Sequence, residues 1–228
     1  MKKPAFRLTG TFLTLFVLFL FSSCIGLSFD IQLNRDGSGR LSLEYRVSSL
    51  INNLGELDGN ESMPALPVSR ADWERTVARI DGMKLVSHSS SEGRTDVETR
   101  VVLEFSNTDA LIAYTGNSSN ISITNNGQSG VFNFVLVDEP VDLGIGEEET
   151  EYYEKIIEMM RLFSDGYNLS ISFGAVRNST LTVTDKDGNT ITPPASAVIV
   201  PSGRRVSFSM PIMDVFDLTN GLGLRFTW

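Results

Sequence analysis

Residues that carry most catalytic and metal-binding chemistry are nearly absent from this chain. Its 228 residues include one cysteine, Cys24, and one histidine, His88. A single cysteine excludes a disulfide within the chain and a site built from several thiolates. His88 adjoins Ser87 and Ser89, but neighbours along a strand point to opposite faces, whereas a catalytic triad gathers its groups around one imidazole ring. We therefore predict no catalytic residue and interpret His88 as incidental.

Motifs that bind metals and phosphates are missing as well. There is no G-x-S-x-G elbow and no glycine-rich phosphate loop. Asp185, Asp187 and Asn189 have the alternating spacing of a calcium loop, yet Thr190 and Ser196 stand where that loop requires Gly and Glu. A turn between strands explains this segment without an ion. We predict no metal and no cofactor. Two carboxylates that meet in a cleft could still form a catalytic pair, and the sequence alone does not test this alternative.

Positive charge and long apolar runs are scarce too. The 19 Lys and Arg are outnumbered by 28 Asp and Glu, which gives a net charge of −9. Nucleic-acid binding requires clustered Lys and Arg, so no nucleic-acid partner is predicted. The same acidity disfavours a folded body that lies flat on anionic lipid. Beyond residue 23, no apolar run reaches the ~20 residues that a membrane-spanning helix needs.

The longest apolar run lies at the N-terminus, at residues 12–21. Three basic residues precede it, and Ser22, Ser23 and Cys24 follow it. A charged region followed by an apolar region is typical of a secretory signal, and this run is shorter than a spanning helix. We predict that residues 1–23 are a leader. Its removal takes away three basic residues and no acidic ones, so the mature chain has 16 Lys and Arg against 28 Asp and Glu, a balance of −12.

The residues Phe21-Ser22-Ser23-Cys24 resemble the lipobox of bacterial lipoproteins, where a signal peptidase cuts before a cysteine that carries diacylglycerol. Phe21 stands where Leu is commonest. The resemblance implies that Cys24 is lipidated, with palmitate-type chains as a membrane anchor, and that the body lies in the bacterial envelope. Two acyl chains anchor stably because each buried methylene contributes ~0.8 kcal/mol. An ordinary secretory signal with an incidental cysteine is the alternative.

Alternation of apolar and polar residues predicts about ten strands. They lie at 27–33, 41–47, 83–89, 96–105, 121–124, 131–137, 169–173, 181–183, 197–200, 205–209 and 222–228. The segment 49–67 is predicted as a short helical turn and a loop.

Capping patterns predict two or three helices. Ser69 followed by Asp72 marks the start of the first helix, and Asp81-Gly82 marks its stop. A second helix is expected at 107–114, and a third after the acidic run 147–151, which suits a helix N-terminus. We predict an α+β fold: a largely antiparallel β-sheet of about ten strands with two or three helices packed on one face, all within residues 24–228.

The order hairpin, helix, Asp-Gly, strand occurs twice, within 27–115 and within 120–175, and residues 176–228 form a β-rich section. We treat this pseudo-repeat as a hypothesis because side chains do not match between the halves. Apolar residues of the two longer helices are candidates for lining a ligand cavity, since methionine adapts to varied shapes. These candidates are Trp73, Met159, Met160 and Phe163, for which an ordinary core role is the alternative.

Two short motifs resemble a known family. Residues 35–39 read RDGSG between alternating segments, and residues 103–111, LEFSNTDAL, pass from a predicted strand to a predicted helix. Over most of residues 25–228 this layout resembles the LppM-type domain of bacterial lipoproteins, in which a D-G-(S/T)-G hairpin and an F-(S/T)-x-x-x-x-L junction recur. The resemblance implies an α+β fold that binds a lipid or glycolipid at the envelope, and it implies no catalytic residue.

These observations predict a lipid-anchored, non-catalytic envelope protein that binds a lipid-like or other apolar ligand. Its partners would be the membrane, through Cys24, and such a ligand or an envelope protein. The alternative is a structural or adaptor lipoprotein with a protein-binding face, which exposed sheet edges or an apolar patch would favour. A hydrolase is the third reading, and it would need His88 hydrogen-bonded to a carboxylate in a cleft.

Overall fold

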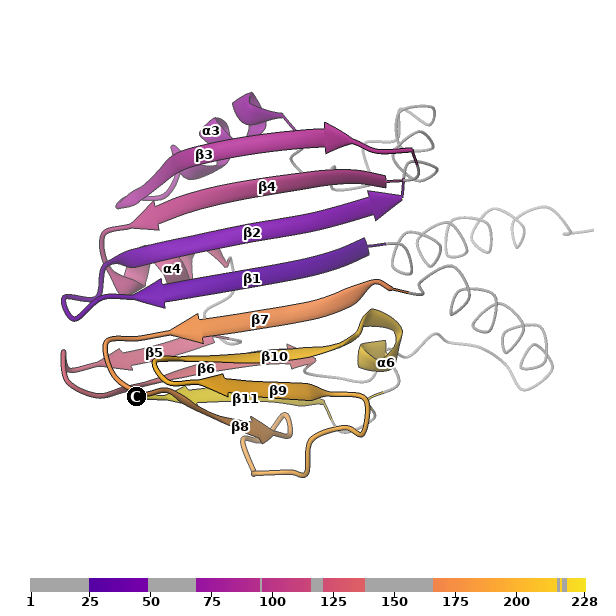
Figure 1. Cartoon of the computed structure of the whole chain (residues 1–228). Coiled ribbons are helices and arrows are strands. Elements are labelled where there is room, and N and C mark those ends of the chain that lie inside the picture. Colours follow the sequence, from indigo (N-terminus) through magenta and orange to yellow (C-terminus); the bar gives the residue numbers. More distant parts are fainter. Residues whose placement is uncertain are drawn as a thin grey trace, which may run out of the picture.

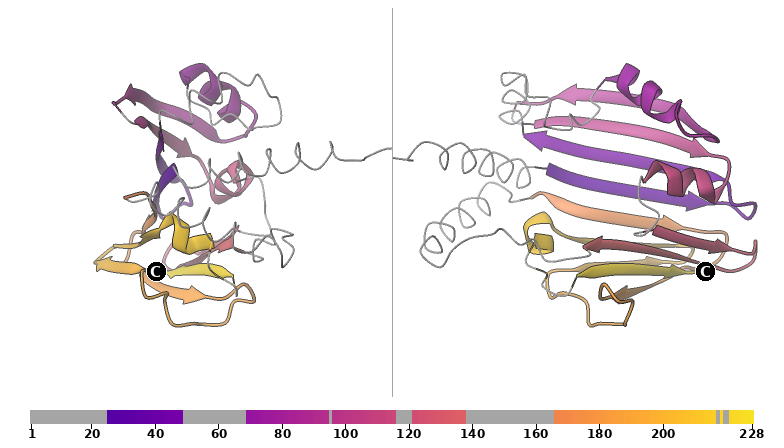
Figure 2. Two further views of the ribbon diagram at one scale, coloured as in Figure 1. Left: turned by 90° about the vertical axis from the view of Figure 1, so that its right-hand side faces the viewer. Right: turned by 180° about the vertical axis from the view of Figure 1, so that it is seen from behind.

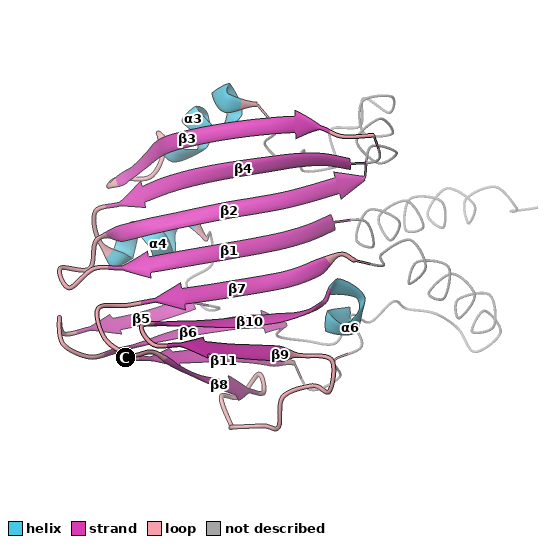
Figure 3. Ribbon diagram, viewed as in Figure 1, coloured by secondary structure: helices cyan, strands magenta, loops and turns pink. Residues whose placement is uncertain are grey.

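The computed structural model describes residues 25–48, 69–94, 96–115, 121–137, 166–216, 218 and 221–228. These residues form eleven strands and three helices, arranged in two β-sheets with the helices beside them (Figure 1; Figure 3). Cys24, the loop expected at 49–67, and the helix expected after 147–151 lie outside the described residues. None of the described helices has the length and apolar character needed to cross a bilayer.

Seven strands form the larger sheet, in the order β3-β4-β2-β1-β7-β10-β9. Their bounds are β1 Ile25–Leu33, β2 Gly39–Ser48, β3 Met83–Glu92, β4 Asp96–Phe105, β7 Asn168–Gly174, β9 Val198–Ser202 and β10 Arg205–Pro211. Neighbouring strands are antiparallel except β1 and β7, which run parallel with Leu27 opposite Leu169. Parallel neighbours need a long connection, and here the connection contributes strands to both sheets.

Four antiparallel strands form the smaller sheet, in the order β5-β6-β11-β8. Their bounds are β5 Ile121–Asn125, β6 Gly130–Val137, β8 Thr180–Thr184 and β11 Leu222–Thr227. Figures 1 and 2 show this sheet behind β7, β10 and β9, with α4 (Thr108–Tyr114) behind β1 and β2 and α3 (Arg70–Val77) beside β3. One face of the larger sheet is therefore covered by described elements.

The opposite face of the larger sheet, here called the outer face, has no described element over it and is turned toward the viewer in Figure 1. It carries the side chains that alternate with the buried ones along each strand. They include Ser28, Asp30 and Gln32 of β1; Arg40, Ser42, Glu44 and Arg46 of β2; Glu98, Arg100, Val102 and Glu104 of β4; Ser170 and Ser172 of β7; and Ser207 and Ser209 of β10.

The predicted start of the first helix is confirmed by its hydrogen bonds. The hydroxyl of Ser69 accepts from the backbone N–H of Asp72 at 3.2 Å, which satisfies one of the free donors of the first turn. Trp73 and Val77 are buried. The predicted stop at Asp81-Gly82 is wrong: helix α3 ends at Val77, with Ala78 as its C-cap in the right-handed conformation, and Gly82, with φ +81°, lies in the turn that leads into β3.

The shorter helices are also set by local sequence. The side chain of Asn107 accepts from the backbone N–H of Ala110 at 2.9 Å and so caps α4, whose Leu111 is buried. The connector before the last strand contains α6, Ile212–Phe216. Both helices bring apolar side chains to the core.

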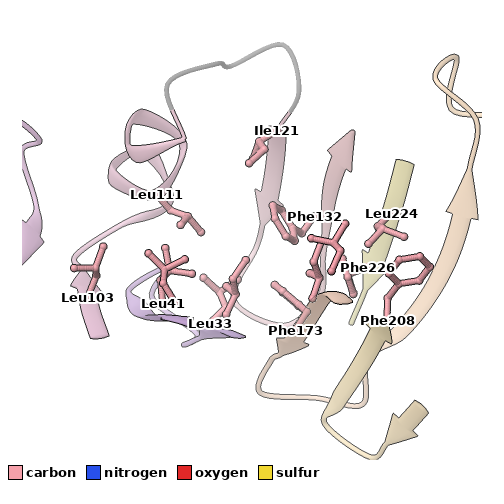
Figure 4. Packing of buried hydrophobic residues seen from close by; sticks show 14 of the residues in the cluster. Leu33, Leu41, Leu103, Leu111, Ile121, Phe132, Phe173, Phe208, Leu224 and Phe226 are labelled. Carbon is pink, nitrogen blue, oxygen red and sulfur yellow. The ribbon is translucent and has the colours of Figure 1, made fainter. Parts of the chain in front are cut away.

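The core between the two sheets contains a cluster of aromatic rings, some stacked and some tilted against each other (Figure 4). The ring of Phe173 of β7 lies 5.4 Å from that of Phe132, 5.2 Å from that of Phe226 and 5.1 Å from that of Trp228. Such pairs contribute ~0.5–1.5 kcal/mol each beyond the burial of their surface. Because these residues come from both sheets, the stack fixes one sheet against the other.

Gly39 permits a close approach between three strands. A Cβ atom at this position would lie 2.1 Å from the backbone oxygen of Gln32 and 2.4 Å from the ring of Phe105. Phe105 is the residue opposite Gly39 in the pair of β2 and β4, so its ring occupies the space that a side chain would need. Gly130 has the same relation to Trp228, whose ring would be 2.2 Å from a Cβ. The last residue of the chain thus packs on a glycine of β6.

The α+β class is confirmed, with strands close to the predicted ones and helices on one side of the larger sheet. Local patterns did not reveal the second sheet or the parallel pairing of β1 with β7. The pseudo-repeat of 27–115 and 120–175 stays a prediction. In the first segment β1, β2 and β3 share one sheet, whereas in the second β5 and β6 lie in the smaller sheet and β7 lies in the larger one.

We expect Gly39→Ala to lower the free energy of unfolding by ~1–3 kcal/mol, because the added methyl group overpacks a site bounded by backbone and an aromatic ring. Gly174→Ala is the matched control, since a Cβ there would meet its nearest atoms at 3.8 Å. Urea unfolding of both variants measures the difference. Equal stability of the two variants would contradict the packing described around Gly39.

Candidate functional site

Charged side chains of β2 and β4 form a lattice of ion pairs on the outer face. Arg100 lies between Glu44, at 3.0 Å, and Glu98, at 2.5 Å, and Arg40 pairs with Glu104 at 2.8 Å. These pairs are on the surface, so each contributes only ~0–1 kcal/mol and can exchange its partner for a ligand group. The half of the outer face formed by β2 and β4 is therefore covered by paired charges.

The other half of the outer face carries small hydroxyl side chains over β1, β7 and β10, the serines named above. Ser170 and Ser209 are within hydrogen-bond distance of each other, at 2.9 Å. Asp30 lies beside these serines; one carboxylate oxygen pairs with Arg205 at 3.1 Å, and the other is buried without a hydrogen-bond partner. The side chain as a whole is 27% exposed, so the Asp30 carboxylate is partly accessible on the outer face.

A larger hollow of about 480 Å³ opens on the outer face at the end where β1 turns into β2. Its walls are formed by Gln32, Asn34, Ser38, Gly39, Arg40, Gly82, Lys84, Glu104, Phe105 and Ser106. It is open to solvent and lined by amide, hydroxyl and charged groups, with one aromatic ring. Its size falls in the range of small-ligand sites, and its lining suits a polar ligand more than an acyl chain.

A smaller hollow of about 150 Å³ lies at the opposite end of the same face, beside the first residues of β1. Its walls are formed by Gly26, Leu27, Ser28, Glu44, Arg46, Gly166, Tyr167, Asn168 and Ser170. The hydroxyl of Tyr167 donates to a carboxylate oxygen of Asp96 at 2.5 Å, which holds the tyrosine over this end of the sheet. The two hollows therefore occupy the two ends of one polar face.

The described carboxylates with displaced pKa values belong to turns and caps. A hydrogen bond from Ser38 lowers the pKa of Asp36, and hydrogen bonds from Ser69 and then Arg75 lower that of Asp72. For Asp185 the largest cause is a hydrogen bond from the side chain of its turn partner, Asn189, at 3.0 Å. Each shift stabilises the ionised form, which is opposite to what a carboxyl needs in order to act as a general acid. The carboxylates of Asp36, Asp72 and Asp185 therefore stabilise turns and a helix cap.

Trp73, a candidate ligand contact, lies in the core with 3% of its surface exposed. Its ring stacks on that of Tyr114 at 6.5 Å, and its indole nitrogen makes no hydrogen bond of ordinary geometry. Burial raises the pKa of the nearby Tyr45 phenol, and the hydroxyl of Thr99 and the indole of Trp73 offset part of the rise. Burial also raises the pKa of Tyr114, with a smaller contribution from Tyr45. Trp73 thus packs among buried aromatic side chains and lines neither of the two hollows.

The other sequence candidates are placed as follows. His88 lies in β3 opposite Val101 of β4, just beyond a register shift between Leu85 and Ser87, and is half-buried. Within the described ranges, no three His, Cys, Asp or Glu side chains gather as a metal site. Met159, Met160 and Phe163 lie outside those ranges.

Neither hollow is apparent from the sequence. Arg40 and Glu104 are 64 positions apart, and only the order β4-β2-β1 brings them to one surface. A usable signal was the run of polar residues that alternate with the apolar ones on each predicted strand. That signal marks a solvent-facing side, but it does not show which strands are neighbours.

Comparison with known proteins yields a distant likeness. No protein-family model matches the chain, and no curated protein matches its sequence. A similar solved structure is the folded domain of LppM from Mycobacterium tuberculosis, determined by NMR, which is 9% identical with a TM-score of 0.41; the match covers 89% of this chain and 88% of that one. At this identity and TM-score, no property of that domain transfers to the chain. By its own architecture, the chain is an α+β protein of two sheets with one polar, open face.

The buried phenols generate a testable pH dependence. Because the pKa values of Tyr45 and Tyr114 are raised in the folded protein, their contribution to stability is complete below the ordinary value of 10.0 and is lost as pH rises through the folded values. We expect the urea midpoint to fall above pH 10, and Tyr114→Phe to weaken that fall. A matching decline in the variant and the parent protein would contradict the burial of this phenol.

Proposed function

We propose that the chain is a lipid-anchored, non-catalytic protein of the bacterial envelope, with the outer face of its larger sheet as its binding surface. The observation that carries this proposal is that β1 begins at Ile25, directly after the cysteine of the lipobox-like sequence. With Cys24 acylated, the sheet would be joined to the membrane without a flexible tether. The larger hollow would then be held at the end remote from the lipid.

The dimensions of the sheet support this arrangement. All nine residues of β1 pair with β2, from Ile25 opposite Val47 to Leu33 opposite Gly39. At ~3.3 Å per residue, this hairpin spans about 30 Å. The larger hollow lies at the Gly39 end, so an anchor at residue 24 would present it to the aqueous compartment.

The proposed absence of catalysis is supported by what the polar groups of the described residues do. The charged side chains at the two hollows include Arg40, Glu44, Arg46 and Glu104, which form exposed ion pairs on the sheet surface, and Lys84, which also lines the larger hollow. The carboxylates with lowered pKa values hold turns and a helix cap. The proposed role is therefore binding.

The chemistry of the larger hollow favours a polar ligand, whereas the LppM-type resemblance and the apolar helix residues favour a lipid-like one. Of the apolar candidates, Trp73 is part of the packed core, and Met159, Met160 and Phe163 lie outside the described residues. Binding of a lipid-like ligand by Met159, Met160 and Phe163 therefore stays a prediction. For the outer face we propose a polar ligand.

A second candidate function, that of an adaptor for an envelope protein, is favoured by two exposed valines. Val198 and Val200 of β9 are 57% and 51% exposed and lie on the outer face, opposite Ser209 and Ser207. Pro201 is adjacent to them and offers no backbone N–H, which makes this edge a poor template for strand addition. A protein partner would therefore contact the valine side chains on the face of the sheet.

The anchor is tested by intact-mass analysis and fractionation of the protein from its host. We expect the mature chain to begin at Cys24, to carry the added mass of two or more acyl chains, and to sediment with membranes. Cys24→Ser is expected to lose the acyl mass and to leave the membrane fraction after cleavage elsewhere, or to keep its leader. A free thiol in the wild-type mature chain would disprove the anchor.

Photo-crosslinking in cells separates the two binding roles. A photoreactive residue at Ser106, which lines the larger hollow, should yield adducts with a polar ligand, and one at Val198 should yield adducts with a protein if the adaptor role is correct. Lys186, which is exposed and outside both regions, is the control position. Adduct yields at Ser106 and Val198 no higher than at Lys186 would exclude the outer face as the binding surface.

A further inference from the structure

The smaller hollow lies beside the residue where the proposed lipid anchor joins the sheet. We propose that it receives the headgroup of a zwitterionic phospholipid of the anchoring bilayer, with the phosphate at Arg46 and the ammonium group at Glu44. This inference rests on the proposed acylation of Cys24 and adds to it the part of the folded body that contacts the membrane.

Distance along the chain places the hollow at the bilayer surface. Gly26 lines the hollow and is two residues from Cys24. An extended chain advances at most ~3.3–3.6 Å per residue, so these two positions are separated by about 7 Å or less. If the sulfur of Cys24 carries lipid at the membrane interface, headgroups of neighbouring lipids lie within reach of the hollow.

Charge supports a zwitterion as the occupant. Glu44 and Arg46 are two residues apart on β2 and so project from the same face. Their side chains are 43% and 48% exposed, and their existing partners are Arg100 at 3.0 Å and Glu98 at 3.9 Å. Exposed pairs of this kind are weak, so phosphate and ammonium groups can compete for both side chains. Guanidinium groups also match phosphate oxygens in geometry.

The walls suit a small polar group. Gly26 has no side chain, and the ring of Tyr167 lies 3.4 Å from the position that a Cβ would occupy there. The hydrogen bond from Tyr167 to Asp96 keeps this ring in place. Asn168 and Ser170 add an amide and a hydroxyl group. At about 150 Å³, the hollow is smaller than a drug-sized site and admits a headgroup more readily than an acyl chain.

The acidity of the chain argues against an anionic lipid as the preferred occupant. The predicted mature chain carries 16 basic and 28 acidic residues, and such a balance repels a negatively charged surface. Glu44 inside the hollow has the same effect locally. A headgroup that bears both charges avoids this cost because its ammonium group meets the carboxylate.

The acylated full-length mature protein allows a direct test, since its own cysteine is blocked and an introduced one is the single free thiol. Ser91→Cys, at the residue-25 end of the sheet, and Ser202→Cys, at the opposite end, each receive a nitroxide label. The labelled proteins are placed in vesicles of phosphatidylethanolamine and phosphatidylcholine that contain a nickel-chelating lipid. We expect relaxation by the headgroup-bound nickel to be several-fold greater at position 91 than at position 202.

Charge variants test the assigned roles. We combine Glu44→Gln and Arg46→Gln, one at a time, with the nitroxide at position 91. Each variant is expected to lower the nickel-induced relaxation of this nitroxide about twofold, because it loses one exposed charge contact with the headgroup. Arg40→Gln is the matched control, because Arg40 lies on the same strand and face, is 50% exposed and is likewise ion-paired, but it lines the larger hollow. We expect this control to behave as the parent does.

The outcomes separate the inference from the anchor. Acylated protein with equal relaxation at positions 91 and 202, or with no change in Arg46→Gln, would overturn the headgroup contact while leaving the anchor in place. Stronger relaxation in phosphatidylglycerol vesicles than in the zwitterionic ones would overturn the choice of headgroup. Intact mass showing an unacylated chain would overturn both proposals.

Discussion

The arrangement of this protein depends on the pairing of β1 with neighbours on both sides. β1 pairs with the antiparallel β2 along its whole length and with the parallel β7 over Leu27–Gln32. Its place at the centre of the larger sheet joins the two halves of the fold. β2 leads to β4 and β3, whereas β7 leads to β10 and β9 and carries Phe173 into the aromatic stack. Loss of either pairing would separate the two halves.

This constraint divides the molecule into a rigid interior and a polar surface. The covered face of the larger sheet packs against two helices and the smaller sheet, and its stacked rings leave little freedom between the layers. The outer face carries serines, ion pairs and two open hollows at its ends. Binding groups held on strands are positioned more precisely than groups on loops. The proposed functions therefore use the surface and leave the interior to hold its shape.

Sequence patterns predicted the local elements well and the long-range arrangement poorly. The hairpin at 27–47 and the helix caps at Ser69 and Asn107 follow from periodicity and capping chemistry, which act over a few residues. The parallel pairing of Leu27 with Leu169 joins distant segments, and no local rule selects it. For the same reason, the hollows could not be found before the strand order was known.

The role of Trp73, a candidate ligand contact, also depends on neighbours that are distant in sequence. Trp73 was a candidate for lining a ligand cavity, with a core role as the alternative, and the structure places it in the core. Helical spacing reports which side of a helix is buried. The same spacing cannot distinguish a core residue from one that lines a ligand site. That distinction needs the neighbours, and for Trp73 they are the buried rings of Tyr114 and Tyr45.

In the proposed arrangement the larger sheet starts beside the acylated Cys24 and its strands extend away from the membrane. Polarised infrared spectroscopy of the acylated protein in oriented bilayers measures this arrangement, because the amide I dichroism of β-strands reports their angle to the membrane. We expect strands oriented close to the membrane normal. An isotropic signal, or strands lying in the membrane plane, would rule the arrangement out.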